Sequence, residues 1–305
     1  MGLECFRGAT MYNTIIKTSI KKVKPYLFIF PAAFMLGLII LFPVIKVFIY
    51  SFQDNIIQEP TFVGLQNYQT VLADARFPKM IRFTLIFTLG SVAMHIIIGI
   101  VLAVLLNTRI NRAVLTVFRV VFVFPWVFTA AVVALVWQLM LQPQGVVNAV
   151  ISLLAGKTVL LEWLGKPWLA IISIMIINAW RGYPTCMVSF LAGLQNIPEE
   201  MYEAAALDGA GRIKQFFALT LPSLKPVILS VGLLDAIWTM NLFPLIWLTT
   251  GGGPLGMTET IATLTYRISF VEFNFGKASA LAVISLLLTM IGVVFYMRAQ
   301  RVTDE

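Results

Sequence analysis

The chain has 305 residues, of which 59% are apolar and only 12% are charged, and its mean hydropathy is +0.90. A soluble domain carries about twice that share of charged residues, so the composition argues against a soluble enzyme, a nucleic-acid-binding protein or a disordered scaffold. It favours an integral membrane protein. The net charge of +8 matches the lysines and arginines that membrane proteins keep on the cytoplasmic side.

Six apolar stretches are long enough to cross a bilayer as helices, which takes roughly 20 residues each. Each is longer than a barrel strand and lacks the alternation of one. The sequence therefore predicts an all-α polytopic protein with one membrane domain at 25–298, between an N-terminal tail at 1–24 and a C-terminal tail at 299–305. The predicted spans cover about residues 25–50, 81–106, 117–141, 168–193, 226–249 and 275–297.

Lysines and arginines predict the orientation of these spans. With the N-terminus in the cytoplasm, 13 of them lie on the inner side near span ends and 7 on the outer side. This excess places both tails in the cytoplasm. The first span is too long for a cleaved signal peptide, so we expect an uncleaved signal anchor.

Few residues could support a metal site or a disulfide. Cys5 lies in the N-terminal tail and Cys186 inside a predicted span, so a disulfide between them is not expected. The only histidine, His95, cannot build a metal site alone, and we expect it to pack between helices. The sequence thus predicts no metal in this chain.

The loop between the fourth and fifth predicted spans, residues 194–226, is the most informative segment. Asn196 is placed to cap a short helix whose first turn contains two glutamates, where the helix dipole favours acids. Asp208 and Gly209 then break that helix and turn the chain.

A second short helix is expected over Gly211–Thr220, with Leu221 and Pro222 ending it. Both helices would lie at the inner face of the membrane. The first helix has acidic and small residues on its surface, which favours docking into a groove of a protein partner. A plain interfacial connector is the alternative, although such helices usually carry a basic face.

The same loop resembles the EAA motif of bacterial ABC-importer permeases, E-A-A-x3-G-x9-I-x-L-P. Here the motif reads Glu203-Ala204-Ala205, three residues, Gly209, nine residues, and then Leu219-Thr220-Leu221-Pro222, with Leu219 as the one departure. Further segments, including "FVGLQNY", "WRGYP" and "LTTGGGP", resemble carbohydrate importer permeases of the maltose type in the same order. The resemblance covers about residues 25–298, and "TGGGP" at 250–254 is similar to the first of the two paired permease subunits.

This resemblance implies an importer of several subunits. A second homologous permease would complete the sugar pathway, two cytoplasmic ATPases would bind ATP and magnesium, and an extracytoplasmic binding protein would deliver the sugar. The chain itself would be no enzyme and would hold no cofactor. The residues implied to couple it to the ATPase are Glu203, Ala204, Ala205, Asp208, Gly209, Leu221 and Pro222.

Polar residues inside the spans predict the pathway, because charges at the bilayer centre are costly and are retained for function. Arg181 and Asp235 are the two mid-span charges, and we hypothesise that they pair across the pathway; the alternative is that each faces separate water-filled space or polar partners. Sugars bind by stacking on aromatic rings and by hydrogen bonds to their hydroxyls. The candidate pathway residues are Asn178, Arg181, Gly182, Tyr183, Asp235, Trp238 and Asn241.

The resemblance supports this set only in part. Maltose-type permeases have the same residue types at the positions of Asn178, Gly182 and Asn241. Trp238 stands where they have an asparagine, so the resemblance does not identify the sugar. For each aromatic residue alone, ordinary helix packing is the alternative. Because of Arg181, a phosphorylated polyol is an alternative substrate.

Two other classes of function are weaker alternatives. A secondary transporter driven by an ion gradient needs intramembrane carboxylates and usually inverted repeats, and only Asp235 qualifies. An intramembrane enzyme needs a nucleophile paired with a base, or a set of metal ligands. One histidine and one mid-span acid do not provide either.

Overall fold

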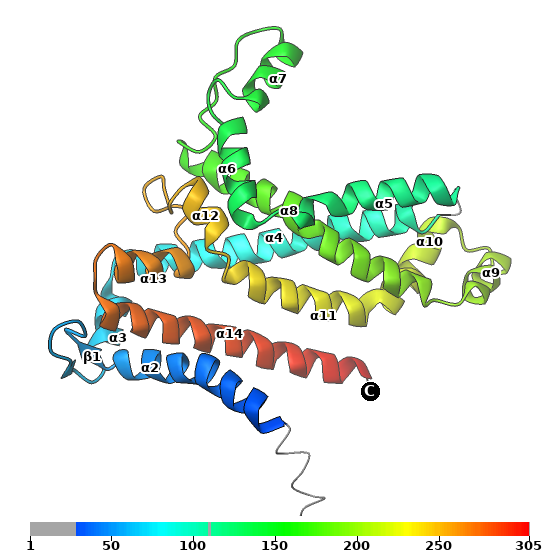
Figure 1. The fold of residues 1–305 in the computed structure, drawn as a ribbon. Helices are drawn as coiled ribbons and strands as arrows, with labels where there is room; N and C mark the ends of the chain where they lie inside the picture. The colour runs from blue at the N-terminus through cyan, green and yellow to red at the C-terminus, as the bar shows by residue number, and fades with distance from the viewer. Residues whose placement is uncertain (1–28, 109–110, 305) are drawn as a thin grey trace, which may run out of the picture.

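The computed structural model describes residues 29–108 and 111–304. The predicted N-terminal tail, Cys5 and the start of the first predicted span lie outside the described residues. The described chain is mostly helical, with one two-stranded sheet in which Gln53 pairs with Phe62 (Figure 1). The elements are η1 (Gly37–Leu41), α2 (Phe42–Tyr50), β1 (Gln53–Asp54), β2 (Thr61–Phe62), α3 (Gln66–Ala73), α4 (Phe77–Leu106), α5 (Arg112–Val127), α6 (Ala130–Met140), α7 (Val146–Ala155), α8 (Pro167–Gln195), α9 (Glu199–Leu207), α10 (Arg212–Gln215), η2 (Phe216–Thr220), α11 (Leu221–Met240), α12 (Pro244–Thr249), α13 (Ile261–Phe270) and α14 (Phe275–Asp304).

Among the described residues, four continuous helices are long and apolar enough to cross a membrane: Ile29–Tyr50, Phe77–Leu106, Arg212–Met240 and Phe275–Val294. They correspond to the first, second, fifth and sixth predicted spans. The bent pair α5–α6 makes a fifth if it counts as one span. The fourth predicted span folds as α8, which has 29 residues but a polar middle and is not among these apolar helices.

The third predicted span is not the single helix expected over 117–141. It divides into α5 and α6, which meet at an angle of 94°. Phe128 and Thr129 adopt extended backbone conformations, and the Thr129 side chain caps α6 by accepting a hydrogen bond from the N–H of Val132. Pro125 precedes the break and cannot donate a backbone hydrogen bond.

The short helix expected over Gly211–Thr220 does not end at Leu221-Pro222, which corrects that prediction. The chain instead forms one continuous helix from Arg212 to Met240. A π-helical segment, η2, ends at Thr220, two residues before Pro222. Its wider turn accommodates the ring of Pro222. In a regular α-helix this ring would clash with the backbone carbonyl of the residue four positions earlier.

The fifth predicted span also ends earlier than expected. The helix stops at Met240 rather than at Thr249, and residues 241–243 separate it from the short helix α12. Pro244 lies in the first turn of α12, where its fixed φ and missing N–H are tolerated. A broken helix of this kind requires neighbouring protein around its free backbone groups, and α12 packs against α6 and α8.

The helices α4 and α8 form the most extensive helix–helix contact of the described chain, and α11 lies alongside both (Figure 1). Gly99 of α4 permits the close approach, because a Cβ there would lie 2.7 Å from Cβ of Cys186 and 3.0 Å from the backbone nitrogen of Met187. Small residues at such contacts are typical of membrane helices. The buried core beside it includes Ala103, Leu106, Met187, Phe190, Leu194 and Leu224.

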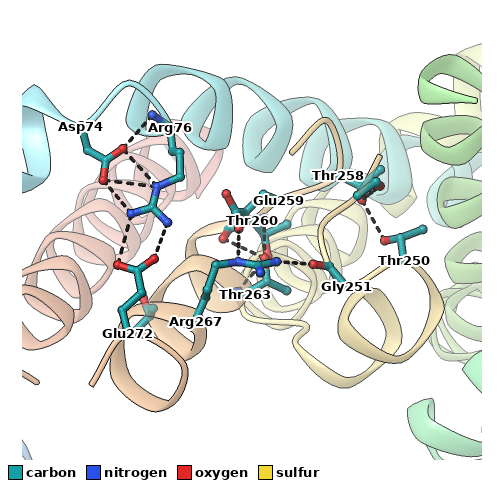
Figure 2. A network of polar contacts seen from close by, with 12 residues as sticks. Asp74, Arg76, Thr250, Gly251, Thr258, Glu259, Thr260, Thr263, Arg267 and Glu272 are labelled. Atoms are coloured by element: carbon teal, nitrogen blue, oxygen red, sulfur yellow. Dashed lines mark hydrogen bonds and ion pairs between the residues drawn. The ribbon is translucent and has the colours of Figure 1, made fainter. Parts of the chain in front are cut away.

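At the end of the bundle that carries the α13–α14 loop, an ion-pair network joins α3 and α4 to α14 (Figure 2). Asp74 contacts both Arg76 and Lys277 at 2.8 Å, and Arg76 contacts Glu272 at 2.6 Å. Hydrogen bonds from Arg76, then from Lys277, hold the pKa of Asp74 well below its usual 3.8, and Arg76 also lowers the pKa of Glu272. The network therefore ties segments about 200 residues apart in the sequence.

We expect Gly99→Ala to destabilise the chain although alanine is the better helix former. The added methyl group must push Cys186 and the backbone of α8 away, at a cost of about 1–3 kcal/mol. Thermal unfolding in detergent measures the effect. Gly292→Ala in α14 is the matched control, because a Cβ at Gly292 meets no atom within 4 Å. Equal midpoints for the two variants would contradict close packing at Gly99.

The lowered pKa of Asp74 predicts that the folded chain loses stability at acidic pH. The ionised carboxylate stabilises the folded chain at any pH above its unfolded pKa, near 3.8, and this contribution is lost as the pH falls below that value. Asp74→Asn should lower the thermal midpoint at pH 7 and flatten its fall on acidification. A midpoint at pH 7 equal to that of the wild type would count against the network.

Candidate functional site

A pocket of about 270 Å³ lies between α4, α5, α8 and α11. Its wall combines two indole rings with charged, amide and hydroxyl groups. Five of the seven predicted pathway residues line it, and the predicted set is thus largely brought together. The lining residues are His95, Trp126, Asn178, Arg181, Gly182, Thr185, Asp235, Trp238, Thr239 and Leu242.

Tyr183 and Asn241, the other two predicted pathway residues, lie outside this pocket. Tyr183 is buried, and its hydroxyl donates a hydrogen bond to the carbonyl oxygen of Phe122 on α5 at 3.0 Å. One residue along a helix turns the side chain by about 100°, so Gly182 and Tyr183 face different neighbours. Asn241 follows the end of α11, donates to the carbonyl of Ile237 and lines a separate hollow with Thr265.

Asp235 is not paired with Arg181 in the described chain, which corrects the hypothesis drawn from the sequence. Its Oδ2 atom lies 2.6 Å from Nδ1 of His95. The other ring nitrogen, Nε2, lies 2.9 Å from the backbone oxygen of Asn178. The sequence marked His95 only as a packing residue; its distance of 140 residues from Asp235 concealed the contact.

Gly182 makes room for this arrangement. A Cβ at this position would collide with the imidazole ring of His95, whose side chain is 1% exposed. Three helices therefore converge on one ring: α4 carries it, α8 accepts its Nε2 hydrogen bond and offers the space of Gly182, and α11 supplies Asp235. This convergence gives Gly182 a steric role that its residue type alone did not specify.

Two donors of the pocket residues have no partner in the described chain. They are Nε of Arg181 and Nδ2 of Asn178, both buried. The indoles of Trp126 and Trp238 are more than half exposed. Unmet donors beside aromatic faces suit a solute with many hydroxyl groups. Trp126 was missed from the sequence, because its place near the pocket depends on the bend between α5 and α6.

A second candidate surface is α9, the helix of the EAA-like motif. Leu207, which ends it, is 91% exposed, and Met201 is exposed as well. Gly209 forms the predicted elbow with φ of +77°, a conformation that favours glycine. Leu207 was not singled out from the sequence, where it reads as an ordinary helix former.

The remaining motif residues divide between the elbow and the long helix. Glu203, Ala204 and Asp208 are exposed and Ala205 is partly exposed. Leu221 and Pro222 open α11 instead of ending a loop. The predicted cap at Asn196 is wrong: Asn196 ends α8, and α9 starts after Pro198, whose side chain cannot accept a hydrogen bond.

Side-chain contacts hold α9 against the start of the long helix. The Tyr202 and Thr220 hydroxyls lie 3.0 Å apart, and Nε2 of Gln215 donates to the carbonyl of Ala210 at 2.9 Å. These contacts brace α9 against the first turns of the helix Arg212–Met240, ahead of Pro222.

The "TGGGP" segment folds as a braced loop between α12 and α13 (Figure 2). Nε of Arg267 donates to Glu259 at 2.9 Å, Nη2 of Arg267 donates to the carbonyl of Gly251, and the guanidinium lies over the ring of Trp247. The Thr250 and Thr258 hydroxyls are 2.8 Å apart. Within the described residues there is no cluster of three or more histidine, cysteine or acidic residues that could hold a metal ion.

Comparison with known proteins places these features in a family. The family described as "Binding-protein-dependent transport system inner membrane component" matches residues 95–304. The trehalose/maltose transport system permease protein MalF of Thermococcus litoralis is 34% identical over 279 residues, which cover 90% of this chain and 93% of MalF. The diacetylchitobiose uptake system permease protein DasB of Streptomyces coelicolor is 30% identical over 90% of this chain and 85% of DasB.

Solved structures agree on the fold. A chain of a bacterial ABC transporter that imports the acidic polysaccharide alginate superimposes with a TM-score of 0.82 at 21% identity, covering 94% of this chain and 98% of that one. A bacterial alginate ABC transporter in complex with a periplasmic protein bound to an alginate pentasaccharide gives a TM-score of 0.83 at 20% identity, covering 94% of this chain and 97% of that one. The long match to the family and the two relatives at 30% identity or more lead to one conclusion: this chain belongs to the binding-protein-dependent transport system inner membrane components.

Proposed function

We propose that this chain is one of two permease subunits of an ATP-driven importer and forms half of a pathway for a sugar or oligosaccharide. The observation that carries the proposal is the continuous helix Arg212–Met240. Near one end it presents Asp235 and Trp238 to the polar, indole-lined pocket, and at the other it is braced against the exposed helix α9. One element therefore joins a solute site to a docking surface.

The carbohydrate substrate is supported by two independent features. The relatives MalF and DasB are named for trehalose/maltose transport and diacetylchitobiose uptake. The pocket offers two indole faces and unmet hydrogen-bond donors, the groups that bind sugars. We propose that an extracytoplasmic binding protein delivers the sugar and that a second permease completes the pathway.

Coupling to ATP hydrolysis is proposed for α9. Its exposed motif residues, Glu203 with Ala204 and Ala205, would sit in a cleft of a cytoplasmic ATPase, and Gly209 would keep the elbow tight. Leu207 adds an apolar anchor, since a leucine exposed to 91% on a helix end suits a hydrophobic groove. ATP and magnesium would bind to that partner, and this chain would carry out no catalysis.

We further propose six membrane spans with α8 as the fourth and both termini in the cytoplasm. The 29 residues of α8 reach about 43 Å at 1.5 Å per residue, enough to cross a bilayer. Its polar middle faces the pocket, which explains its lower hydropathy. The excess of inner lysines and arginines favours a cytoplasmic location for α9 and for the tails 1–24 and 299–305.

A phosphorylated polyol remains the second candidate substrate, on the strength of Arg181. In the described part of the chain its Nε atom has no acceptor, and a phosphate or carboxylate group would supply one. An ion-coupled secondary transporter is disfavoured, because its one candidate ion ligand, Asp235, is engaged by His95.

Exchange of the exposed leucine tests the assembly. We expect Leu207→Asp to abolish recovery of an ATPase when the tagged chain is purified in mild detergent, because the charge cannot enter an apolar groove. Recovery of the second permease should persist. The matched control is Leu154→Asp on α7, a leucine exposed to 83% at a distant site. Recovery of an ATPase in equal yield from Leu207→Asp would refute docking through α9.

Two aromatic variants test the pathway. We expect Trp238→Ala to raise KM for sugar uptake by about tenfold in the reconstituted importer, because a stacking face is lost. Tyr183→Phe removes a hydrogen bond to α5, so it should cost about 1 kcal/mol of stability and leave KM unchanged. The opposite pattern, with KM raised only by Tyr183→Phe, would move the pathway to the other face of α8.

A further inference from the structure

The contact between His95 and Asp235 fixes the number of protons that the two side chains hold. The backbone oxygen of Asn178 can only accept, so the hydrogen bond at 2.9 Å requires a proton on Nε2 of His95. Nδ1 and Oδ2 of Asp235 lie 2.6 Å apart, and a hydrogen bond of that length requires one proton between them. Without it, two lone pairs would face each other.

This proton count makes the pair neutral. The shared proton gives either an imidazolium with a carboxylate or an imidazole with a carboxylic acid, and both have zero net charge. A bare carboxylate within a membrane helix would be costly. The proton on His95 removes that cost and leaves Oδ1 of Asp235, which accepts no hydrogen bond in the described chain, on a group that lines the pocket.

We infer that His95 is a positioning residue, which holds Asp235 through one shared proton so that Oδ1 accepts a hydrogen bond from a hydroxyl group of the transported sugar. This inference rests on the proposed function. The hydrogen bond from Nε2 and close packing against Gly182 hold the imidazole ring of His95 in place. The ring therefore cannot follow Asp235 if that side chain turns. The carboxyl group thus keeps one orientation toward the pocket.

The surroundings contain few groups that could compete for the proton. On α8, the charged group that lines the pocket is Arg181. The groups that α5 and α11 add to the pocket lining are Trp126, Trp238 and Thr239, which are uncharged. His95 is therefore the group that can neutralise Asp235 by direct contact.

The variant Asp235→Asn tests the hydrogen bonds of residue 235 without the shared proton. In Asp235→Asn the amide N–H can donate to Nδ1 of a neutral His95, and the amide oxygen still accepts from a hydroxyl group. In Asp235→Leu, which is of similar size, both interactions are lost. Neither variant alters α4 or the hydrogen bond to Asn178, so the two differ only in what His95 and the solute meet at residue 235.

The contact itself is measured by nitrogen NMR, because His95 is the only histidine of the chain. The chain is labelled with ¹⁵N-histidine and placed in lipid nanodiscs at pH 8, where an imidazole without an acidic partner is neutral. We expect Nε2 to be protonated, with a proton shared at Nδ1. In Asp235→Leu, Nδ1 should carry neither a proton nor a hydrogen bond. A wild-type spectrum like that of Asp235→Leu would overturn the inference.

The positioning role is measured by uptake of maltose, trehalose and diacetylchitobiose in the reconstituted complete importer. His95→Ala should raise KM about tenfold with kcat within about twofold, and Asp235→Leu should match it. KM of Asp235→Asn should stay at least fivefold below that of Asp235→Leu. Glu59→Gln, which alters an exposed carboxylate outside the pocket, is the control and should behave as wild type.

A purely structural role makes a different prediction. His95→Ala would then lower thermal stability and leave KM at the wild-type value, which overturns the inference. If His95→Ala fails to assemble, equal KM values for Asp235→Asn and Asp235→Leu overturn it instead. A wild-type importer that takes up none of the three sugars refutes the proposed function and with it the positioning role, whereas the NMR result still decides whether the shared proton exists.

Discussion

The close approach of α4 and α8 is the constraint on which the rest of the described structure depends. Both helices contribute glycines to it: Gly90 and Gly99 on α4 face Met175 and Cys186, and Gly182 on α8 faces His95. In a bilayer, association of helices gains little from the hydrophobic effect, so packing at short distance and interhelical hydrogen bonds must supply the stability. Both occur at this contact, and α11 is then held against the pair through Asp235.

The same constraint explains where polar groups are found. The lipid and the apolar side chains around these helices exclude water, so buried polar side chains need protein partners or a solute. His95 and Asp235 satisfy each other, whereas Arg181 and Asn178 keep donors that nothing in the described chain accepts. Both residues line one pocket, which two indoles also line. A permeating sugar that these side chains turn to meet can form the missing hydrogen bonds and leave again, because each one contributes only about 1–3 kcal/mol.

The sequence predicted the helical membrane fold and most of the pocket, since long apolar runs and costly mid-span charges are local signals. It failed where the outcome depended on contacts between distant segments. The 94° bend after Val127 has only Pro125 and Thr129 as local signs, and both also occur in straight helices. The partner of Asp235 was misassigned because Arg181 offered the opposite charge, while the histidine that contacts it lies 140 residues away. Tyr183 lies outside the pocket because one residue of helix rotation separates the pocket from the core.

The position of the π-helical segment η2 determines how motion at α9 could reach the pocket. Asp235 lies 23 residues after Arg212, or about 35 Å along the helix axis. A straight helix would transmit a displacement of α9 over that distance as a rigid rod, and the contact between Asp235 and His95 would resist it at the far end. The helix is weakest near η2, Pro222 and Pro226, where regular hydrogen bonds are missing. We therefore expect bending to concentrate just beyond the elbow, so that α4, α8 and the pocket end of α11 keep their arrangement while the docking surface moves.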